Sequence, residues 1–216
     1  MAFRAAAFPL MVAAVLFTAA GSLELPQLWA YVLLNALFTV VGLAVMDPEL
    51  IRERERPGGV CIYRRPVGVP VALGVFGHWI VAGLDVGRYH WSDTVPPVLQ
   101  VASFAALAAS MAITTWAAHV NRFFSSVVRI QTERGHHVVD RGPYAVVRHP
   151  GYAAGIVLCL ASGLALGSWW SVAIAVAGVP GILWRTVAED RTLQRELSGY
   201  ADYAARVRYR LVPGIW

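Results

Sequence analysis

The sequence contains no lysine and has few charged residues of any kind. Only 14% of its 216 residues are charged, whereas soluble domains carry about 25%. Hydrophobic residues make up 57% of the chain. This imbalance argues against an ordinary soluble domain and predicts an integral membrane protein.

Cysteine is also scarce, which limits the chemistry that the chain can support. The two cysteines, Cys61 and Cys159, fall in a predicted cytoplasmic loop and inside a predicted membrane span, so we expect no disulfide. The Cys and His residues do not have the spacing of a metal site. His136 and His137 are adjacent and poorly arranged to share an ion, so no metal is expected.

Six apolar runs predict membrane-spanning helices. Each is roughly 16–26 residues long, against the ~20 needed to cross the hydrocarbon core. We expect the last two runs to form a helical hairpin that turns at Gly167 and Ser168. The predicted fold is an all-α integral membrane protein of about six (five to six) transmembrane helices, with a cytoplasmic cap and a C-terminal amphipathic helix. The runs cover about residues 6–22, 26–46, 68–85, 95–120, 152–167 and 169–186.

The arginines predict the orientation in the membrane. Nearly all lie before span one, between spans two and three, between spans four and five, or after span six, and only Arg88 lies on the other side. Cytoplasmic loops collect Arg and Lys, so both termini should be cytoplasmic. Topology and attraction to anionic lipid explain the net charge of +5, so no nucleic-acid partner is expected. The Ala-, Val- and Arg-rich, Lys-free composition is typical of a GC-rich bacterial genome and favours the bacterial inner membrane.

The chain divides into two predicted parts. Residues 1–120 form a four-helix scaffold rich in small residues, which let helices pack closely in lipid. In this part, His78 and His119 are expected to make packing or interfacial hydrogen bonds. Residues 121–216 hold a long cytoplasmic loop, the hairpin 152–186 and a tail. Because the outer loops are short, the catalytic site is expected in this second part, on the cytoplasmic side.

The loop before the hairpin is rich in turn residues and predicts an ordered cap. Short extended runs at 137–139 and 144–147 flank a turn at Gly142 and Pro143. In the tail, apolar residues recur at spacings of three and four between charged residues, which predicts an amphipathic helix on the membrane or on the cap. These apolar residues are Leu193, Leu197, Tyr200 and Tyr203.

Arg148, His149 and Pro150 stand where the cytoplasmic loop meets span five. A residue before Pro is disfavoured in a helix, and Pro is favoured at the first helical position, so Pro150 should start the span. The open amide groups of a helix start favour an anion. Arg148 adds a positive charge and His149 adds a titratable donor. The stretch predicts a site for an anionic or zwitterionic small molecule, or else an anchor at the lipid headgroups.

Arg185 and Glu189 lie four residues apart at the end of span six, on one helix face. They could form an ordinary surface ion pair of about 0.5 kcal/mol. Alternatively, both could point into one cavity, where Arg185 would suit a carboxylate and Glu189 would suit hydroxyls or an ammonium group. Within the span, Pro180 and its glycine neighbours should distort the helix, and a lipid-soluble substrate could enter beside them.

Two segments flank the hairpin, HHVVDRGPYAVVRHPGY and RTVAEDRTLQRELSGYADY. Together they resemble the isoprenylcysteine carboxyl methyltransferase family, which is similar to bacterial phospholipid N-methyltransferases. The resemblance covers about residues 129–212. It implies an integral-membrane methyltransferase that uses S-adenosylmethionine as its methyl donor.

The resemblance also implies particular site residues. Arg185 would contact the carboxylate of the acceptor, and Arg185, Glu189 and His149 are the predicted catalytic residues. The family often has two glutamates after the last span, where this chain has Glu189 and Asp190, and we assign the role to Glu189. Arg148 joins the cofactor contacts through the helix-start argument. The contacts implied by the family are Gln131, His136, Val138, Val139, Tyr144, His149, Pro150, Tyr152 and Glu189.

The acceptor stays open at this point. It could be an isoprenylcysteine-type carboxylate, a lipid, or a small thiol or amine. A carboxylate needs no base, whereas a neutral thiol or a protonated amine would need one, with His149 or Asp190 as candidates. Two other functions compete with methyl transfer. An NADPH-dependent membrane reductase of the sterol-reductase type would need an arginine cluster for the 2′-phosphate, and none dedicated to this is evident. A scaffold or transporter is disfavoured because the first four spans carry few ionisable residues.

Overall fold

The computed structural model describes residues 2–58 and 68–216, and within them every regular element is a helix. Cys61 and the pair Arg64 and Arg65 lie outside the described residues. Short helices of other types occupy Asp85–Tyr89, Thr132–Arg134 and Gly142–Ala145. The α-helices are α1 (Ala2–Ala20), α2 (Pro26–Val45), α3 (Pro48–Glu55), α4 (Gly68–Leu84), α5 (Pro97–Val120), α6 (Pro150–Ala165), α7 (Trp169–Glu196) and α8 (Tyr200–Arg206).

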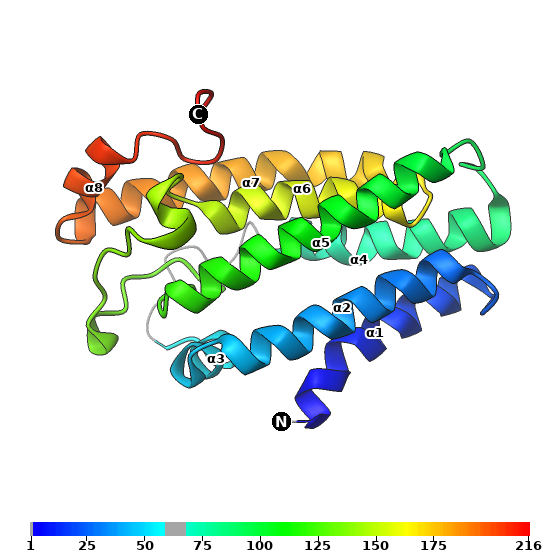
Figure 1. Cartoon of the computed structure of the whole chain (residues 1–216), viewed down its shortest axis with the longest axis horizontal. Coiled ribbons are helices and arrows are strands. Elements are labelled where there is room, and N and C mark those ends of the chain that lie inside the picture. The colour runs from blue at the N-terminus through cyan, green and yellow to red at the C-terminus, as the bar shows by residue number, and fades with distance from the viewer. Residues whose placement is uncertain (1, 59–67) are drawn as a thin grey trace.

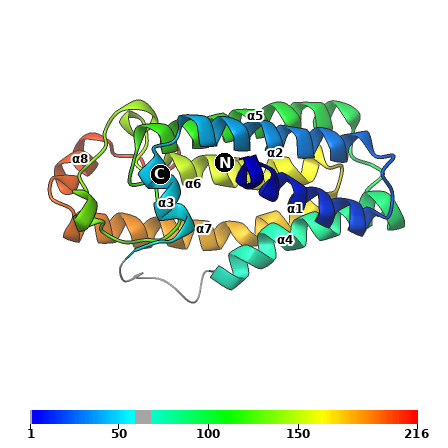
Figure 2. The same ribbon diagram turned by 90° about the horizontal axis from the view of Figure 1, so that it is seen from below.

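Six of these helices run alongside one another, and their positions in the sequence match the six apolar runs (Figure 1). Figure 2 shows α2 and α5 along one side of the bundle and α4 and α7 along the other. Helix α5 packs on α2 and α6, and α7 packs on α4 and α6. In the described part of the chain, α2, α5 and α7 are long and apolar enough to cross a membrane, and α1 and α6 contain shorter apolar helices. The chain is therefore an integral membrane protein with an all-helical fold.

Prolines and capping side chains set the helix starts. Helices α2, α3, α5 and α6 each begin at a proline, whose fixed φ suits the first helical position. The predicted hairpin turn is confirmed, because Gly167 has a positive φ of 85°. Ser168 then caps α7 by accepting a hydrogen bond from the Ser171 amide at 3.0 Å. This turn and this cap therefore fix where α6 ends and α7 begins.

Buried polar side chains connect α2, α4 and α6 inside the bundle. The Tyr31 hydroxyl accepts hydrogen bonds from Trp79 Nε1 and from Ser162 Oγ, both at 2.9 Å. His78 Nε2 lies 2.8 Å from Ser162 Oγ. His119 Nδ1 lies 2.7 Å from the Val45 carbonyl. The two histidines therefore make the packing contacts that we expected. Hydrogen-bonded polar groups hold apolar helices in a fixed register.

Arg88, the arginine that lies apart from the others in the sequence, has a local role. Its Nε donates to the Ala19 carbonyl at 2.7 Å, and its NH2 group donates to the Thr18 carbonyl at 3.2 Å. These carbonyls belong to the last turn of α1, which has no helical partners for them. Arg88 therefore caps α1, and its charge complements the helix dipole.

The structure corrects two local predictions in the cap and tail. Residues 144–147 are not an extended run, because Gly142–Ala145 forms a 3₁₀ turn in which Gly142 has a φ of 60° and Pro143 fixes the next residue. The tail is not one amphipathic helix. Helix α7 continues unbroken through Pro180 to Glu196, and α8 follows after a break at Gly199, whose φ is 78°.

The apolar face of the tail packs on the cap. Leu197, Tyr200 and Tyr203 form a buried cluster. Ile130 and Val138 of the loop pack against this cluster. Of the two positions that the sequence allowed for this segment, the structure shows the one on the cap. The tail and the loop therefore close one end of the helix bundle together.

Candidate active site

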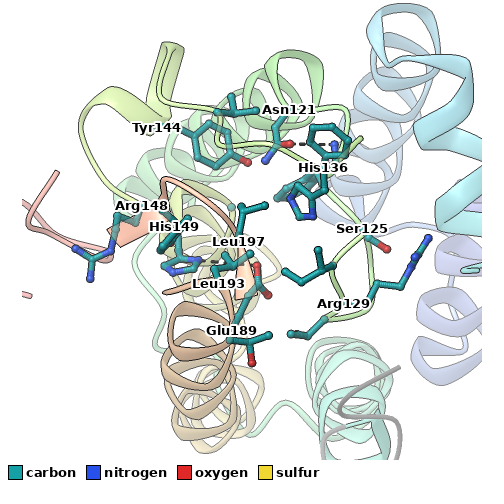
Figure 3. Close-up of a pocket in the computed structure, with 18 of the residues that line it drawn as sticks. Asn121, Ser125, Arg129, His136, Tyr144, Arg148, His149, Glu189, Leu193 and Leu197 are labelled. Carbon is teal, nitrogen blue, oxygen red and sulfur yellow. Dashed lines mark hydrogen bonds and ion pairs between the residues drawn. The ribbon is translucent and has the colours of Figure 1, made fainter. Parts of the chain in front are cut away.

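A cavity of about 370 Å³ lies at this closed end, between the cap loop, the start of α6 and the last part of α7. Figure 3 shows side chains from all three elements facing it. Its volume is within the usual range for a small-molecule site, roughly 300–1,000 Å³. The cavity is thus large enough for a small organic ligand and opens beside the predicted end of the membrane span.

The structure brings together almost all of the predicted site residues. Gln131 is the exception, because it does not line the cavity. Its side chain is 1% exposed and donates a hydrogen bond to the Phe123 carbonyl at 2.9 Å, so it supports the loop from behind. The predicted residues that line the cavity are His136, Val138, Val139, Tyr144, Arg148, His149, Pro150, Tyr152, Arg185 and Glu189.

Arg185 and Glu189 meet through a third residue. Arg185 Nε donates to the Tyr152 hydroxyl at 2.7 Å, and that hydroxyl donates to Glu189 Oε2 at 2.6 Å. Arg185 also donates to the Ser126 carbonyl. Among the described residues, Arg185 has no ion pair with an acidic side chain. The charge of Arg185 is therefore available to an anionic ligand. Of the two alternatives that the sequence left open, the structure does not show the direct ion pair between Arg185 and Glu189.

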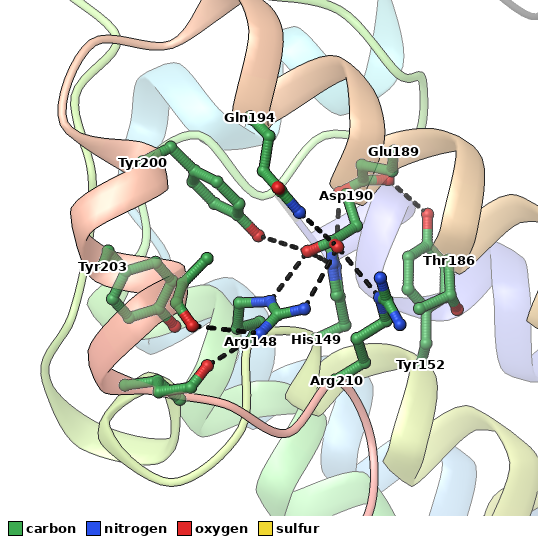
Figure 4. Close-up of polar contacts among 12 residues, drawn as sticks. Arg148, His149, Tyr152, Thr186, Glu189, Asp190, Gln194, Tyr200, Tyr203 and Arg210 are labelled. Carbon is green, nitrogen blue, oxygen red and sulfur yellow. Dashed lines mark hydrogen bonds and ion pairs between the residues drawn. The ribbon is translucent and has the colours of Figure 1, made fainter. Parts of the chain in front are cut away.

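Asp190 is the centre of a buried polar cluster behind the cavity (Figure 4). It is fully buried and accepts hydrogen bonds from Arg148 Nε at 2.8 Å, from His149 Nε2 at 3.2 Å and from Arg210 Nε at 2.9 Å. Gln194 and Tyr200 donate to it as well. Burial raises the pKa of this carboxyl, but the bonds from His149, Arg148 and Arg210 outweigh burial and hold the pKa well below its ordinary value.

Arg148 is turned towards this cluster. Two of its nitrogens bind Asp190, and its third nitrogen donates to the Val207 and Arg208 carbonyls at 2.8 and 2.9 Å. The backbone amides of Arg148 and His149 donate to the carbonyls of Tyr209 and Arg210, each at 2.9 Å. The tail therefore covers the start of α6. Arg148 lines the cavity with its stem, while its guanidinium holds the tail in place.

His149 lies between the cluster and the cavity. Because its Nε2 donates to Asp190, its Nδ1 faces the other way, 4.0 Å from Glu189 Oε1. Asp190 thus fixes the orientation of the imidazole ring in the manner of a carboxylate that orients a catalytic histidine. The arrangement leaves one ring nitrogen for a ligand.

Two buried hydroxyls on the cavity wall lack partners. Tyr144 Oη and Thr192 Oγ1 make no hydrogen bond of good geometry with the described residues, although both are buried. The Tyr144 hydroxyl lies towards the Asn121 amide, and burial raises its pKa. Buried polar atoms without partners are uncommon and point to a missing ligand or water. Both hydroxyls line the cavity, so a polar ligand there would satisfy them.

His136 is held neutral at the far wall. Its Nδ1 accepts a hydrogen bond from the Gln131 amide at 3.2 Å, and its ring stacks near Phe123 with centroids 4.5 Å apart. Burial lowers the pKa of His136 to about 4, and the nearby His137 adds to this effect. A neutral, flat ring beside Phe123 suits an uncharged aromatic group rather than an anion.

The sequence interpretation missed one wall of the cavity. Phe123 to Ile130 line it, although only the residues after 130 were assigned to the site. Arg54, from the first part of the chain, lines it too, as do Leu193 and Leu197 of the tail. The continuous three-and-four spacing after residue 186 could have shown that α7 extends, but no local signal ties Arg54 to the cap.

Comparisons with known proteins give a family match and a similar fold. Residues 100–195 match the model of the isoprenylcysteine carboxyl methyltransferase (ICMT) family. A solved structure of the eukaryotic intramembrane Ras methyltransferase ICMT, without a monobody, is similar in fold, with a TM-score of 0.66 at 15% sequence identity. The alignment covers 98% of this chain and 75% of that one. No curated protein sequence matches the chain.

The family match runs from the first turn of α5 almost to the end of α7 and includes most of the residues that line the cavity. The fold similarity extends over the rest of the chain. Residues 100–195 thus match the isoprenylcysteine carboxyl methyltransferase family, and the whole chain has the fold of a solved ICMT, so the match identifies an integral-membrane methyltransferase that uses S-adenosylmethionine.

Proposed function

We propose that the enzyme methylates the carboxylate of a lipophilic acceptor of the isoprenylcysteine type, and that Arg185 holds this carboxylate. The observation that carries the proposal is the state of Arg185, which lines the cavity and has no acidic partner among the described residues. A guanidinium can bind a carboxylate through two parallel hydrogen bonds. The hydrogen bond from Arg185 to the Tyr152 hydroxyl fixes the direction of this guanidinium.

The same cavity is the proposed site of S-adenosylmethionine, which supplies an electrophilic methyl group when bound. The residues present fit such a ligand. Glu189 suits the ribose hydroxyls, and the neutral His136 beside Phe123 suits a flat base. The free Nδ1 of His149 and the unpartnered hydroxyls of Tyr144 and Thr192 suit the other polar groups of S-adenosylmethionine. The remaining proposed contacts are Val138, Val139, Pro150 and Tyr152, while Gln131 would act only through the loop that it supports.

The chain's own contribution to the reaction is alignment and exclusion of water. A carboxylate nucleophile needs no base, and holding reactants in line can contribute ~7–11 kcal/mol. Arg185 and Tyr152 would orient the acceptor, and the tail that covers the start of α6 would keep water out. Positive and negative charge are lost together in such a transfer, so a dry site favours it.

The geometry also bears on the choice of acceptor. Asp190 and His149 were the candidates for a base that a thiol or an amine would need. The carboxyl of Asp190 is fully buried and bound by several donors, which hold its pKa well below the ordinary range. His149 is bound to that carboxyl. Asp190 is therefore not available as a base, and the free Nδ1 of His149 is assigned to the cofactor in this proposal, which favours a carboxylate acceptor because it needs no base.

For the whole molecule, we propose six membrane spans formed by α1, α2, α4, α5, α6 and α7. The arginine distribution supports cytoplasmic termini and a cytoplasmic site. The Lys-free composition supports a bacterial inner membrane. A cavity at the cytoplasmic end of α6 and α7 would be reached by the cofactor from water and by the acceptor from the bilayer.

The test is methyl transfer by the purified protein to N-acetyl-S-farnesylcysteine and to its carboxamide, each at matched concentration. We expect a base-labile methyl ester from the acid and no product from the amide. Arg185→Ala should lower this activity at least about tenfold, because it removes a hydrogen bond to a charged group. The variant should still bind S-adenosylhomocysteine. Arg191→Ala, an exposed arginine on the same helix, is the matched control. Equal turnover by Arg185→Ala and wild type would rule out this role of Arg185.

A further inference from the structure

Helix α3 lies outside the segment that matches the family, yet it touches the cap. It follows α2 directly and covers Pro48–Glu55, whereas the match begins at residue 100. Figure 1 shows α3 at the same end of the bundle as the cap loop and α8. The helix starts cleanly, because Asp47 caps it by accepting a hydrogen bond from the Glu49 amide at 2.7 Å. It is thus a short, well-anchored helix beside the cavity wall.

A buried ion pair joins α3 to the cap. Glu53 is 7% exposed and Arg129 is 7% exposed. Arg129 Nε donates to Glu53 Oε1 at 2.9 Å, and its NH2 group donates to Glu53 Oε2 at 2.8 Å, so the pair is bidentate. Arg129 also bonds Glu133 at 2.7 Å. The bonds to Glu53 and Glu133 raise the pKa of Arg129 further above its ordinary value.

Further contacts fix the loop on either side of this pair. The Ser125 hydroxyl donates to Glu53 Oε1 at 3.1 Å, and the Gly58 amide donates to Glu53 Oε2 at 3.3 Å. One residue along, Arg54 donates to the Phe124 carbonyl at 3.2 Å. Phe124, Ser125 and Arg129 all line the cavity, whereas Glu53 does not. Two adjacent residues of α3 therefore hold three points of the cavity wall.

From these contacts we infer that Glu53 is a positioning residue for the methyl-donor site and that α3 belongs to the catalytic unit. Glu53 holds Arg129 and Ser125, and through them it sets the shape of the wall from Phe124 to Arg129. This inference rests on the proposed position of S-adenosylmethionine in the cavity. It goes beyond the family match, because α3 and Glu53 lie outside the matched residues.

Physical chemistry predicts what a change at Glu53 would do. If one partner of a buried pair is neutralised, the other keeps its charge and must find a new partner or water. Glu133, a more exposed partner, is still available to Arg129. We therefore expect the wall to shift towards Glu133 rather than the whole fold to be lost. Such a shift would change ligand affinity more than it changes the melting temperature.

The experiment compares Glu53→Gln with Glu49→Gln. Glu49 lies on the same helix and also pairs with a loop arginine, Arg122, but that pair is half-exposed and neither residue lines the cavity. Affinity for S-adenosylhomocysteine is measured by calorimetry, and hydrogen exchange of the backbone amides of residues 123–130 is measured without ligand. Glu53→Gln should bind at least about tenfold more weakly and exchange faster in that segment. Glu49→Gln should stay within about twofold of wild type.

Affinity and segment exchange that match wild type in Glu53→Gln would overturn the inference. So would a loss of affinity that is fully explained by a smaller folded fraction. If Glu53→Gln does not fold, Ser125→Ala tests the same wall without leaving a buried charge, and affinity like that of wild type there would also overturn it. Failure of the wild type to bind S-adenosylhomocysteine would instead reject the proposed cofactor site, together with everything that rests on it.

Discussion

The single residue on which most of the site depends is Asp190. Its carboxylate is fully buried and accepts hydrogen bonds from two arginines and a histidine. Removal of one partner from a buried charge cluster typically costs about 3–5 kcal/mol. We predict that Asp190→Asn lowers the melting temperature strongly and weakens S-adenosylhomocysteine binding. Thermal unfolding in detergent measures the first effect, and Asp140→Asn, in an exposed pair with Arg206, should leave it nearly unchanged.

Asp190 also predicts a pH dependence. The pKa of its carboxyl is lower in the folded protein than its ordinary value of 3.8. The unfolded chain therefore takes up protons first as the pH falls, and the stabilisation from Asp190 is present above pH 3.8 and lost below it. Asp190→Asn should remove that acid-sensitive part of the stability, which unfolding at a series of acid pH values would show. If the variant loses stability at acid pH in the same way as wild type, Asp190 is not the source of this pH dependence.

His136 predicts a second pH effect at higher pH. The pKa of His136 falls from 6.5 to about 4 on folding, mainly because the ring is buried. Between these values the unfolded chain binds a proton that the folded protein does not, so stability should decrease as the pH falls from 6.5 towards 4. His136→Asn should flatten the stability profile in that window. His137→Asn is a suitable control, because His137 is exposed.

Glu189 and Tyr152 predict effects on ligand affinity. Glu189→Ala should weaken cofactor binding by at least ~1.5 kcal/mol, the scale of a hydrogen bond to a charged group. Tyr152→Phe removes the hydroxyl that links Arg185 and Glu189, so Arg185 should lose its fixed direction and turnover should fall more than affinity does. Calorimetry and initial rates separate the two effects. Unchanged affinity in Glu189→Ala would remove Glu189 from the site.

Among the elements, the C-terminal tail gives the clearest prediction. The carbonyls of residues 207–210, rather than their side chains, hold Arg148 and His149. A chain that ends after Arg206 should therefore lose S-adenosylhomocysteine binding, whereas Arg208→Ala should keep it because the backbone is unchanged. Binding by the truncated chain as tight as that of wild type would contradict this role of the tail.

The elements also show what the sequence could predict. Apolar runs of suitable length and the prolines at helix starts were sufficient to locate the six long helices of the bundle and the start of α6. The 3₁₀ turn at Gly142–Ala145 was missed because a β-rich string such as YAVV looks extended without knowledge of how it packs. The length of α7 was missed because the membrane span was taken to end at residue 186, although the helix continues into the cap.

For the site, the family resemblance and the helix-start argument selected residues that are close together in the structure. They missed contacts between distant parts of the chain. Glu53 and Arg129 are 76 residues apart, and nothing local in either segment indicates the other. Arg148 was expected to face a ligand because it lies at a helix start, but its guanidinium forms an ion pair with Asp190 instead. Long-range pairing of this kind depends on the packing of the whole bundle.

At the scale of the whole molecule, the division into a scaffold (1–120) and a catalytic part (121–216) stays a prediction. The contacts of α3 with the cavity wall argue that the catalytic unit includes a segment of the first part. The polar cluster that connects Tyr31, Trp79, Ser162 and His78 likewise ties the first helices to the hairpin. We therefore expect the hairpin with its cap to need the first four spans in order to fold.

The most direct measurement is a calorimetric titration of the detergent-purified protein with S-adenosylhomocysteine, with NADPH titrated in parallel. The cavity described here predicts saturable binding of S-adenosylhomocysteine, lost in His149→Ala and kept in Arg191→Ala, and no binding of NADPH. Binding of S-adenosylhomocysteine that is unchanged in His149→Ala, or binding of NADPH alone, would contradict the placement of the methyl donor in this cavity.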